Sequence, residues 1–281
     1  MTIASGLFIY PIKSCAGIAL QSATLGRAGF EAGGIGDREW MLVDATTGIF
    51  VTQRQAPRMA LIRPRLEGDA LAVEAQGMPP LTLPADELAP RSATLSVKVW
   101  NHECMAFDAG DAAAQWFSAF LNRPVRLARF DPSHRRLSNR EWTSNVEALN
   151  RFSDGYPILA VAEATLAELN DRLIEAGRNA IPMNRFRPNL VLADVGPGDE
   201  DRMVSLRCGA TVLTPVKPCP RCPIPSIDQD TAVRGDDPLD ILAHYRDHKD
   251  LGLIFGQNVI VTAGIGTTLA VGDRFDVEWN F

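Results

Sequence analysis

The sequence predicts a β-rich α+β fold made of two domains, residues 1–125 and 126–281. Short apolar and β-branched runs broken by glycine or proline fill residues 39–99, and this spacing is typical of a barrel or a sandwich. The chain has 281 residues, 46% of them hydrophobic, which can fill one large core or two modest ones, and we favour two. A polar, basic run at residues 133–141 indicates an exposed connection between domains or a loop that folds over a bound group.

Residues 6–12 and 18–25 are predicted strands around a bend at Lys13 and Ser14. Lys13 and Ser14 form either a solvated turn or an anion site, and the glycine-rich lead-in of a phosphate-binding loop is missing. An acidic start, alanine content and apolar residues at helical spacing predict a helix over residues 111–121. The other strands expected in this half are 39–44, 48–52, 58–66, 70–75, 80–83 and 94–99.

The second half alternates strands with fewer helices. An apolar run predicts a strand over residues 156–161, and leucines at helical spacing predict an amphipathic helix over residues 163–176. Ser153 and Asp154, just before them, are typical turn residues. The remaining expected elements are strands at 190–193, 202–207, 210–214, 258–262 and 268–279, and a helix at 236–245 that acidic residues open.

The composition argues against several classes of protein. A formal net charge of −6 without a lysine- or arginine-rich tract argues against a general nucleic-acid binder. No stretch approaches about 18 uninterrupted apolar residues, and no basic leader precedes the first strand, so we expect a soluble, cytoplasmic protein that does not enter a membrane. Five cysteines at irregular spacing fit a reducing compartment better than a secreted disulfide framework.

A proline-rich run at residues 215–228 carries the most distinctive chemistry, with the thiols of Cys219 and Cys222 beside the cations of Lys217 and Arg221. Prolines fix their own φ and push the preceding residues toward extended conformations, so we expect a rigid loop that is neither helix nor central strand. Arg221 beside Cys222 favours the thiolate, which is the form that binds a metal or attacks an electrophile.

Several interpretations of these two thiols compete. They can be ordinary small loop residues. A structural zinc site needs four ligands, yet the other cysteines are isolated, which disfavours it. A dithiol redox centre normally opens a helix, and Pro223 and Pro225 disfavour a helix start here. The remaining interpretation is one thiolate ligand for a metal that a cofactor carries.

Several motifs agree with this interpretation. The run Lys217-Pro218-Cys219-Pro220-Arg221-Cys222, followed by Ser226-Ile227-Asp228, resembles the signature of MOSC domains, the family of molybdenum cofactor sulfurase C-terminal domains and of the amidoxime-reducing component. Residues 9–17 resemble the opening of the β-barrel domain that precedes MOSC in that subgroup. Further blocks in the expected order are Gly36-Asp37-Arg38, Arg187-Pro188-Asn189 and Phe255-Gly256-Gln257-Asn258. Pro223 and Pro225 depart from the family pattern on the substrate side.

The resemblance implies an N-terminal MOSC-associated β-barrel domain, a MOSC β-barrel with flanking helices, and a bound molybdenum cofactor. Cys222 would be the thiolate ligand of molybdenum, and Lys13, Arg38 and Arg187 would converge on the phosphate of the cofactor. The residues that the resemblance places at the cofactor are Lys13, Ser14, Arg38, Ser153, Arg187, Asn189, Lys217, Cys219, Arg221 and Cys222.

The implied activity is the reduction of N-hydroxylated compounds such as amidoximes and N-hydroxylated bases. Asp228 is a candidate for proton transfer, with a turn carboxylate as the alternative role. The cysteines lack ferredoxin spacing, so we expect electrons from a separate ferredoxin, flavoprotein or cytochrome b5-like donor. The alternative function is a protein that carries or stores the molybdenum cofactor, or its sulfur, without turnover.

Overall fold

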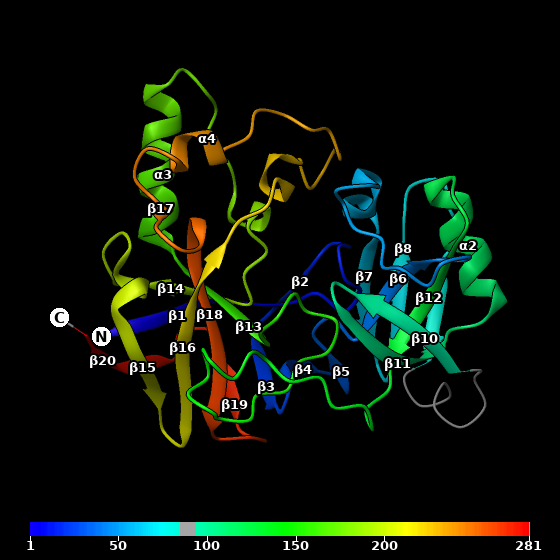
Figure 1. Ribbon diagram of the computed structural model, residues 1–281, viewed down its shortest axis with the longest axis horizontal. Helices are drawn as coiled ribbons and strands as arrows, with labels where there is room; N and C mark the ends of the chain where they lie inside the picture. The colour runs from blue at the N-terminus through cyan, green and yellow to red at the C-terminus, as the bar shows by residue number, and fades with distance from the viewer. Residues whose placement is uncertain (85–93, 281) are drawn as a thin grey trace.

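Strands from both ends of the chain close into one β-barrel (Figure 1). The computed structural model describes residues 1–84 and 94–280. Around the barrel the strands follow the order β13 (Ile158–Ala162), β14 (Leu190–Ala193), β1 (Thr2–Ile9), β20 (Arg274–Trp279), β15 (Met203–Cys208), β16 (Thr211–Pro220) and β18 (Gly252–Ala263). The barrel closes because β18 also pairs with β13. Strands β2 (Ile18–Leu20) and β17 (Asp247–His248) pair with β1 and β18.

Strand β1 belongs to the predicted first domain, yet it pairs with β14 and β20 of the second. The barrel therefore crosses the boundary between residues 125 and 126, whose position stays a prediction. The ladder of β1 shifts register between Ala4 and Gly6. Side chains alternate between the two faces of a strand, so an irregularity of one residue changes which alternate positions are buried. Ala4 before the shift and Leu7 and Ile9 after it therefore all face the barrel core.

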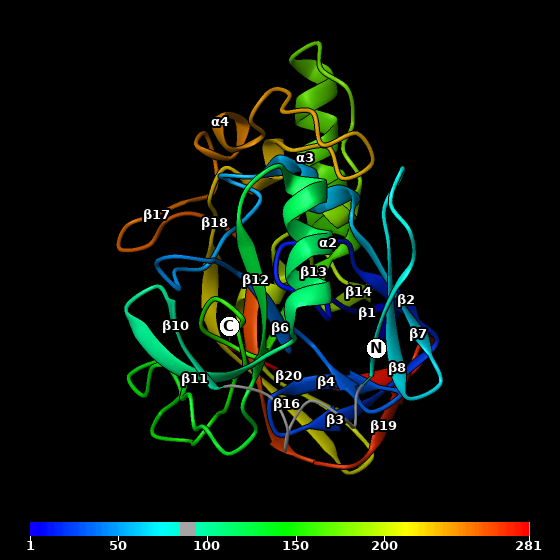
Figure 2. The ribbon, with the colours of Figure 1, turned by 90° about the vertical axis from the view of Figure 1, so that its right-hand side faces the viewer.

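The other half of the molecule contains two more antiparallel sheets and a helix. One sheet has the order β10 (Thr94–Val99), β11 (His102–Asp108), β12 (Val125–Phe130) and β6 (Trp40–Asp44). The other consists of β7 (Arg63–Glu67), β8 (Ala70–Glu74) and β9 (Leu81–Pro84). Figure 2 shows α2 (Asp111–Leu121) beside β12. Its Trp116, Phe117 and Phe120 are buried in a core that includes Trp40.

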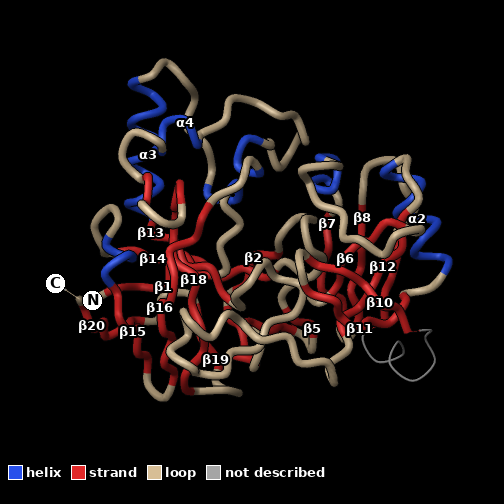
Figure 3. The backbone as a smooth tube through the Cα atoms, in the orientation of Figure 1, coloured by secondary structure: helices blue, strands red, loops and turns tan. Residues whose placement is uncertain are grey.

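The remaining elements are one more sheet and several helices, and long loops fill the centre of the view in Figure 3. Strands β19 (Thr268–Ala270), β3 (Ser22–Gly26), β4 (Gly29–Ala32) and β5 (Ile35–Gly36) form a further sheet. Helix α3 (Glu163–Glu175) buries Leu169 and Leu173 with Phe186 and Phe255, whose rings stack at 3.9 Å. The short helices are η1 (Pro57–Leu61), η2 (Met183–Arg185), η3 (Asp199–Arg202), η4 (Ile224–Ser226) and α4 (Leu239–Leu242). Within residues 1–84 and 94–280, no helix is long and apolar enough to cross a membrane.

The predicted β-rich α+β class is confirmed, as is the helix over residues 111–121. Helix α3 ends one residue earlier than expected. The prediction of a helix over residues 236–245 is wrong in its extent. Only Leu239–Leu242 form a helical turn, and Asp236 and Asp237 lie before it. Residues 57–61 form η1 rather than the start of a strand, and Pro57 at its first position fits a helical start.

The prediction that the proline-rich run lies outside the central strands is wrong for its first part. Strand β16 continues through Pro220 between β15 and β18. The β16–β18 ladder shifts register between Pro215 and Lys217 and again between Pro218 and Pro220. These bulges accommodate prolines, which have no N–H to donate to the ladder. Cys222 therefore follows directly on a barrel strand and precedes η4.

Closing the barrel requires a glycine where β18 passes β13. Gly256 has φ +78°, and a Cβ there would lie 2.6 Å from Val161 Cγ2 and 2.7 Å from the Ala160 carbonyl oxygen. We expect Gly256→Ala to lower the free energy of unfolding by about 3 kcal/mol, from left-handed strain and overpacking. Gly252→Ala is the matched control, since Gly252 has φ +72° but open space around it, and it should cost about 1 kcal/mol. If urea unfolding shows that both variants lose the same free energy, close contact at Gly256 is not what barrel closure requires.

Candidate functional site

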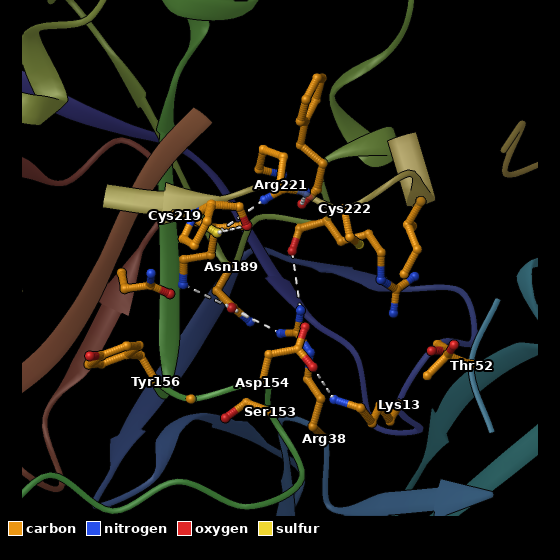
Figure 4. Close-up of a pocket in the computed structure, with 18 of the residues that line it drawn as sticks. Lys13, Arg38, Thr52, Ser153, Asp154, Tyr156, Asn189, Cys219, Arg221 and Cys222 are labelled. Atoms are coloured by element: carbon orange, nitrogen blue, oxygen red, sulfur yellow. Dashed lines mark hydrogen bonds and ion pairs between the residues drawn. The ribbon is translucent and has the colours of Figure 1, made fainter. Parts of the chain in front are cut away.

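A pocket opens where the two halves of the molecule meet, directly beside the end of β16 (Figure 4). Its empty space measures about 800 Å³, including open solvent at the mouth. Segments that are far apart in sequence line it, so its chemistry exists only in the folded chain. The sequence-predicted residues that line it are Lys13, Ser14, Arg38, Ser153, Arg187, Asn189, Cys219, Arg221 and Cys222. The structure thus brings together all but Lys217 and Asp228.

The carboxylate of Asp37 organises the floor of this pocket. Its Oδ1 accepts hydrogen bonds from the Tyr10 backbone N–H at 2.8 Å and from Asn189 Nδ2 at 2.9 Å. Arg38 Nη1 lies 2.7 and 2.6 Å from the two carboxylate oxygens, and it also donates to Asn189 Oδ1. The Asp37–Arg38 pair is largely buried, and such a pair with these extra hydrogen bonds holds its geometry tightly.

Arg187 is a buried cation of the pocket with unused hydrogen-bonding capacity. Its guanidinium and that of Arg38 lie 4.3 and 4.4 Å from the centroid of the Tyr10 ring. Nη1 donates to the Cys15 carbonyl at 2.6 Å, whereas Nη2 is buried without an acceptor among the described residues. Burial lowers the pKa of Arg187 to about 10, so it stays charged at neutral pH. A buried, charged donor without a partner points to an anionic ligand.

Three residues of the pocket have a left-handed backbone. Ser14, Arg38 and Arg187 have φ of 67°, 46° and 57°, the left-handed region that costs residues with a Cβ about 1–2 kcal/mol. Long-range hydrogen bonds hold these residues, such as the one from Gln53 Nε2 to the Ser14 carbonyl. Strain of this kind persists where the surrounding structure imposes it, and it is common at functional sites.

Lys13 crosses the pocket to the segment around Asp154. Its Nζ donates to the Phe152 carbonyl and to Asp154 Oδ1, both at 2.7 Å, and Trp100 Nε1 donates to the same carboxylate oxygen at 3.0 Å. Burial lowers the pKa of Lys13, and Asp154 opposes that shift. Burial would raise the pKa of Asp154, but the Lys13 charge outweighs it and holds the pKa well below its usual range. Asp154 lines the pocket, and 70% of its side chain is exposed.

The two thiols lie in different surroundings. Arg221 Nη1 lies 3.3 Å from Cys219 Sγ, and Arg221 Nη2 donates to the Phe186 carbonyl. The cation next to Cys222 in sequence therefore contacts Cys219 instead. Burial raises the pKa of the Cys219 thiol, and Arg221 opposes the shift. Cys222 is partly exposed on the pocket wall, where a ligand can reach its sulfur.

Lys217 and Asp228 lie outside the residues that line this pocket. Lys217 Nζ lies 5.0 Å from the centroid of the Trp142 ring. The Asp228 carboxylate pairs with Arg185 at 2.8 Å and accepts hydrogen bonds from the Thr231 N–H and hydroxyl. Their roles at a cofactor stay predictions, and this geometry gives them no support.

Sequence reasoning missed three contributions to the pocket. Arg136, in the run expected as an exposed connection, is 4% exposed and donates to the carbonyls of Arg151 and Ser153 at 2.6 and 2.7 Å. Tyr156 turns its hydroxyl into a buried position without an acceptor in the described part of the chain, and burial raises its pKa to about 12. Arg54 also lines the pocket. For Arg136, the sequence offered only the alternative that residues 133–141 fold over a bound group.

The Lys13–Asp154 pair predicts a specific pH dependence of stability. Asp154→Asn removes the counter-charge of Lys13, so we expect a lower Tm at about pH 7. The stabilisation from a carboxylate with a depressed pKa is present above its ordinary pKa of 3.8 and is lost as pH falls through the depressed value. The difference in Tm between wild type and variant should therefore be steady down to about pH 4 and shrink below it. A difference that is constant across calorimetric scans in acid would show that charge is not its cause.

Comparison with family models places the whole pocket within known domain types. The model of the MOSC N-terminal beta barrel domain matches residues 1–124, and that of the MOSC domain matches residues 148–276. Together these ranges contain every segment that lines the pocket.

Full-length relatives extend the comparison. Mitochondrial amidoxime-reducing component 1 of Mus musculus is 34% identical over 262 residues, covering 89% of this chain and 75% of that protein. The Homo sapiens component 1 is 34% identical over 244 residues, covering 85% and 71%. Molybdenum cofactor sulfurase of Bos taurus is 28% identical over 261 residues, covering 88% of this chain but 29% of that protein. The resemblance seen in the sequence motifs is confirmed, and the chain belongs to the MOSC family, with both the N-terminal barrel domain and the MOSC domain.

Proposed function

We propose that this pocket holds a molybdenum cofactor and that the protein reduces N-hydroxylated compounds. The observation that carries the proposal is the arrangement of Cys222 and Arg187, an accessible thiol and a buried unpaired guanidinium that line the same pocket. Relatives named amidoxime-reducing components and a molybdenum cofactor sulfurase support the same assignment.

The residues present fit such a group. A thiolate is a suitable soft donor to molybdenum, and Cys222 provides one at the pocket wall. A phosphate requires cations and N–H donors, and Arg187 and Arg221 have no carboxylate partner among the described residues. Lys13 and Arg38 also face the pocket, but Asp154 and Asp37 already balance their charges. We therefore assign the larger share of phosphate binding to Arg187 and Arg221.

When bound, the molybdenum cofactor supplies two-electron oxygen transfer from an N–OH group. The chain supplies position and hydrogen bonds. Asp154 is ionised at neutral pH and accepts rather than donates, and its bond to Lys13 keeps both side chains at the pocket edge. The Tyr156 hydroxyl remains protonated at neutral pH, because burial raises its pKa to about 12. Protons for the released water then come from solvent.

We propose a separate protein as the electron donor, a ferredoxin, a flavoprotein or a cytochrome b5-like protein. The two amidoxime-reducing relatives are each named as a component, which agrees with a divided electron-transfer system. Location in the cytoplasm stays a prediction.

The assignment of Cys222 is testable with paired serine variants. Cys222→Ser should lose nearly all molybdenum after expression in a host that makes the cofactor, because the protein thiolate is removed. Cys219→Ser should retain most of it. Elemental analysis by mass spectrometry measures the content per folded chain, and reduced viologen with an amidoxime measures turnover. Full metal retention in Cys222→Ser would overturn the assignment, and equal loss in both variants would favour a dithiol site. A loaded, reducible metal without turnover would favour the carrier function.

The two arginines should respond differently to removal of charge. Arg187→Gln should lower cofactor content while the apoprotein stays as stable as wild type, because its guanidinium carries unused donors. Arg38→Gln should lower the free energy of unfolding by about 3 kcal/mol, because it leaves the buried Asp37 carboxylate without its cation. Urea unfolding of the apoproteins and phosphate analysis of the loaded proteins separate the two effects. If Arg38→Gln lowers cofactor content and Arg187→Gln lowers the free energy of unfolding, then Arg38 and not Arg187 binds the ligand.

A further inference from the structure

Arg54 is a cation of the pocket that neither the motifs nor the proposed cofactor site accounts for. It lines the pocket and makes no ion pair with a carboxylate among the described residues. Its guanidinium carbon lies 4.5 Å from the centroid of the Trp100 ring, and its Nε donates to Thr52 Oγ1 at 3.3 Å. Its two terminal nitrogens have no recorded acceptor in residues 1–84 and 94–280, so they are available to a ligand.

The surroundings of Arg54 hold it in one place. Trp100 is itself fixed, because its Nε1 donates to Asp154 and its ring lies 5.1 Å from the Phe50 ring. Trp100 also has a left-handed φ of 54°. Thr52 is 1% exposed. A guanidinium that is stacked on a fixed indole loses little entropy when it binds, and it presents a planar pair of donors that matches a carboxylate.

Different groups hold Arg54 and the cations that we assign to the cofactor. Figure 4 shows Thr52 and Tyr156 at opposite sides of the pocket, with Cys222 and Asp154 between them. Arg187 is held under Tyr10 and Cys15, whereas Arg54 is held against Trp100. Asp154 accepts a hydrogen bond from Trp100 but pairs with Lys13, and it makes no ion pair with Arg54 among the described contacts.

We propose that Arg54 and Trp100 form a subsite for an anionic group of the substrate, so that the favoured N-hydroxylated compounds carry a carboxylate or a similar oxyanion. The inference rests on the proposed function and names its substrate class. Arg54 binds the oxyanion through its terminal nitrogens, and the Trp100 ring holds the guanidinium in place. Such a subsite orients the substrate within the pocket that Cys222 also lines.

The test compares two probes that differ by one charge, benzamidoxime and its 4-carboxylate. The measured quantity is the ratio of kcat/KM for the carboxylate to that for the neutral probe, using molybdenum-loaded protein and reduced viologen. We expect Arg54→Gln to lower this ratio about tenfold, since a charge-assisted bidentate contact is removed. Arg54→Lys should restore it only in part, because lysine lacks the planar fork. The ratio in wild type should also fall with added salt.

Arg58→Gln is the matched control. Arg58 lies four residues further on, stacks on Phe120 at 4.5 Å and lines a different surface hollow, so it repeats the charge change outside this pocket. The kcat/KM ratio of Arg58→Gln for the two probes should equal that of wild type. A ratio unmoved by Arg54→Gln, or lowered equally by both variants, overturns the proposal. Loss of molybdenum in Arg54→Gln also overturns it, because Arg54 would then serve the cofactor.

A binding measurement keeps this inference separate from the proposed activity. Calorimetric titration with 4-carboxybenzamidine, the product-like carboxylate, requires no turnover. We expect binding to weaken about tenfold in Arg54→Gln and not in Arg58→Gln. If wild type reduces neither amidoxime, the proposed function fails while the titration still decides whether Arg54 binds an oxyanion. Equal affinity in wild type and Arg54→Gln rejects the subsite.

Discussion

The buried carboxylate of Asp37 is the interaction on which the rest of the site depends. It joins Tyr10 after β1, Arg38 before β6 and Asn189 before β14, three segments that no local structure would bring together. Because a buried charge must be paired and hydrogen-bonded, each of these partners is held in place by the need to satisfy it. Tyr10 then presents its ring to Arg187, and the left-handed backbone at Arg38 becomes tolerable. One carboxylate thus connects the barrel to the pocket floor.

The distribution of charge separates residues that build the pocket from residues that serve a ligand. Arg38 and Lys13 face carboxylates, and their geometry is fixed before any ligand arrives. Arg187, Arg221 and Arg54 face carbonyls, a thiol or an indole, and within the described ranges none of them meets a carboxylate. Such cations favour an anionic ligand, because the ligand supplies the negative charge that no carboxylate of the pocket gives them. A chain with a net charge of −6 can therefore contain a local site for anions.

Much of the fold was predictable because its signals are local. The alanine-rich start of α2 and the leucine spacing of α3 determine those helices almost to the residue. The continuation of β16 through Pro220 was not predictable, because bulges against β18 depend on partners that are distant in sequence. The sequence motifs predicted that Cys222, Arg187 and Lys13 belong to one site, and all three line the pocket. The burial of Arg136, the contact of Arg221 with Cys219 and the position of Arg54 on Trp100 arise from tertiary packing and have no short sequence signature.

The central claim is that a molybdenum centre binds Cys222 in the pocket that Asp37 organises. The most direct measurement is a crystal structure of the loaded protein with anomalous diffraction recorded at the molybdenum absorption edge. The account predicts one anomalous peak within bonding distance of Cys222 Sγ and phosphate density against Arg187. A peak bonded to Cys219 instead, or a molybdenum centre outside this pocket, would contradict it.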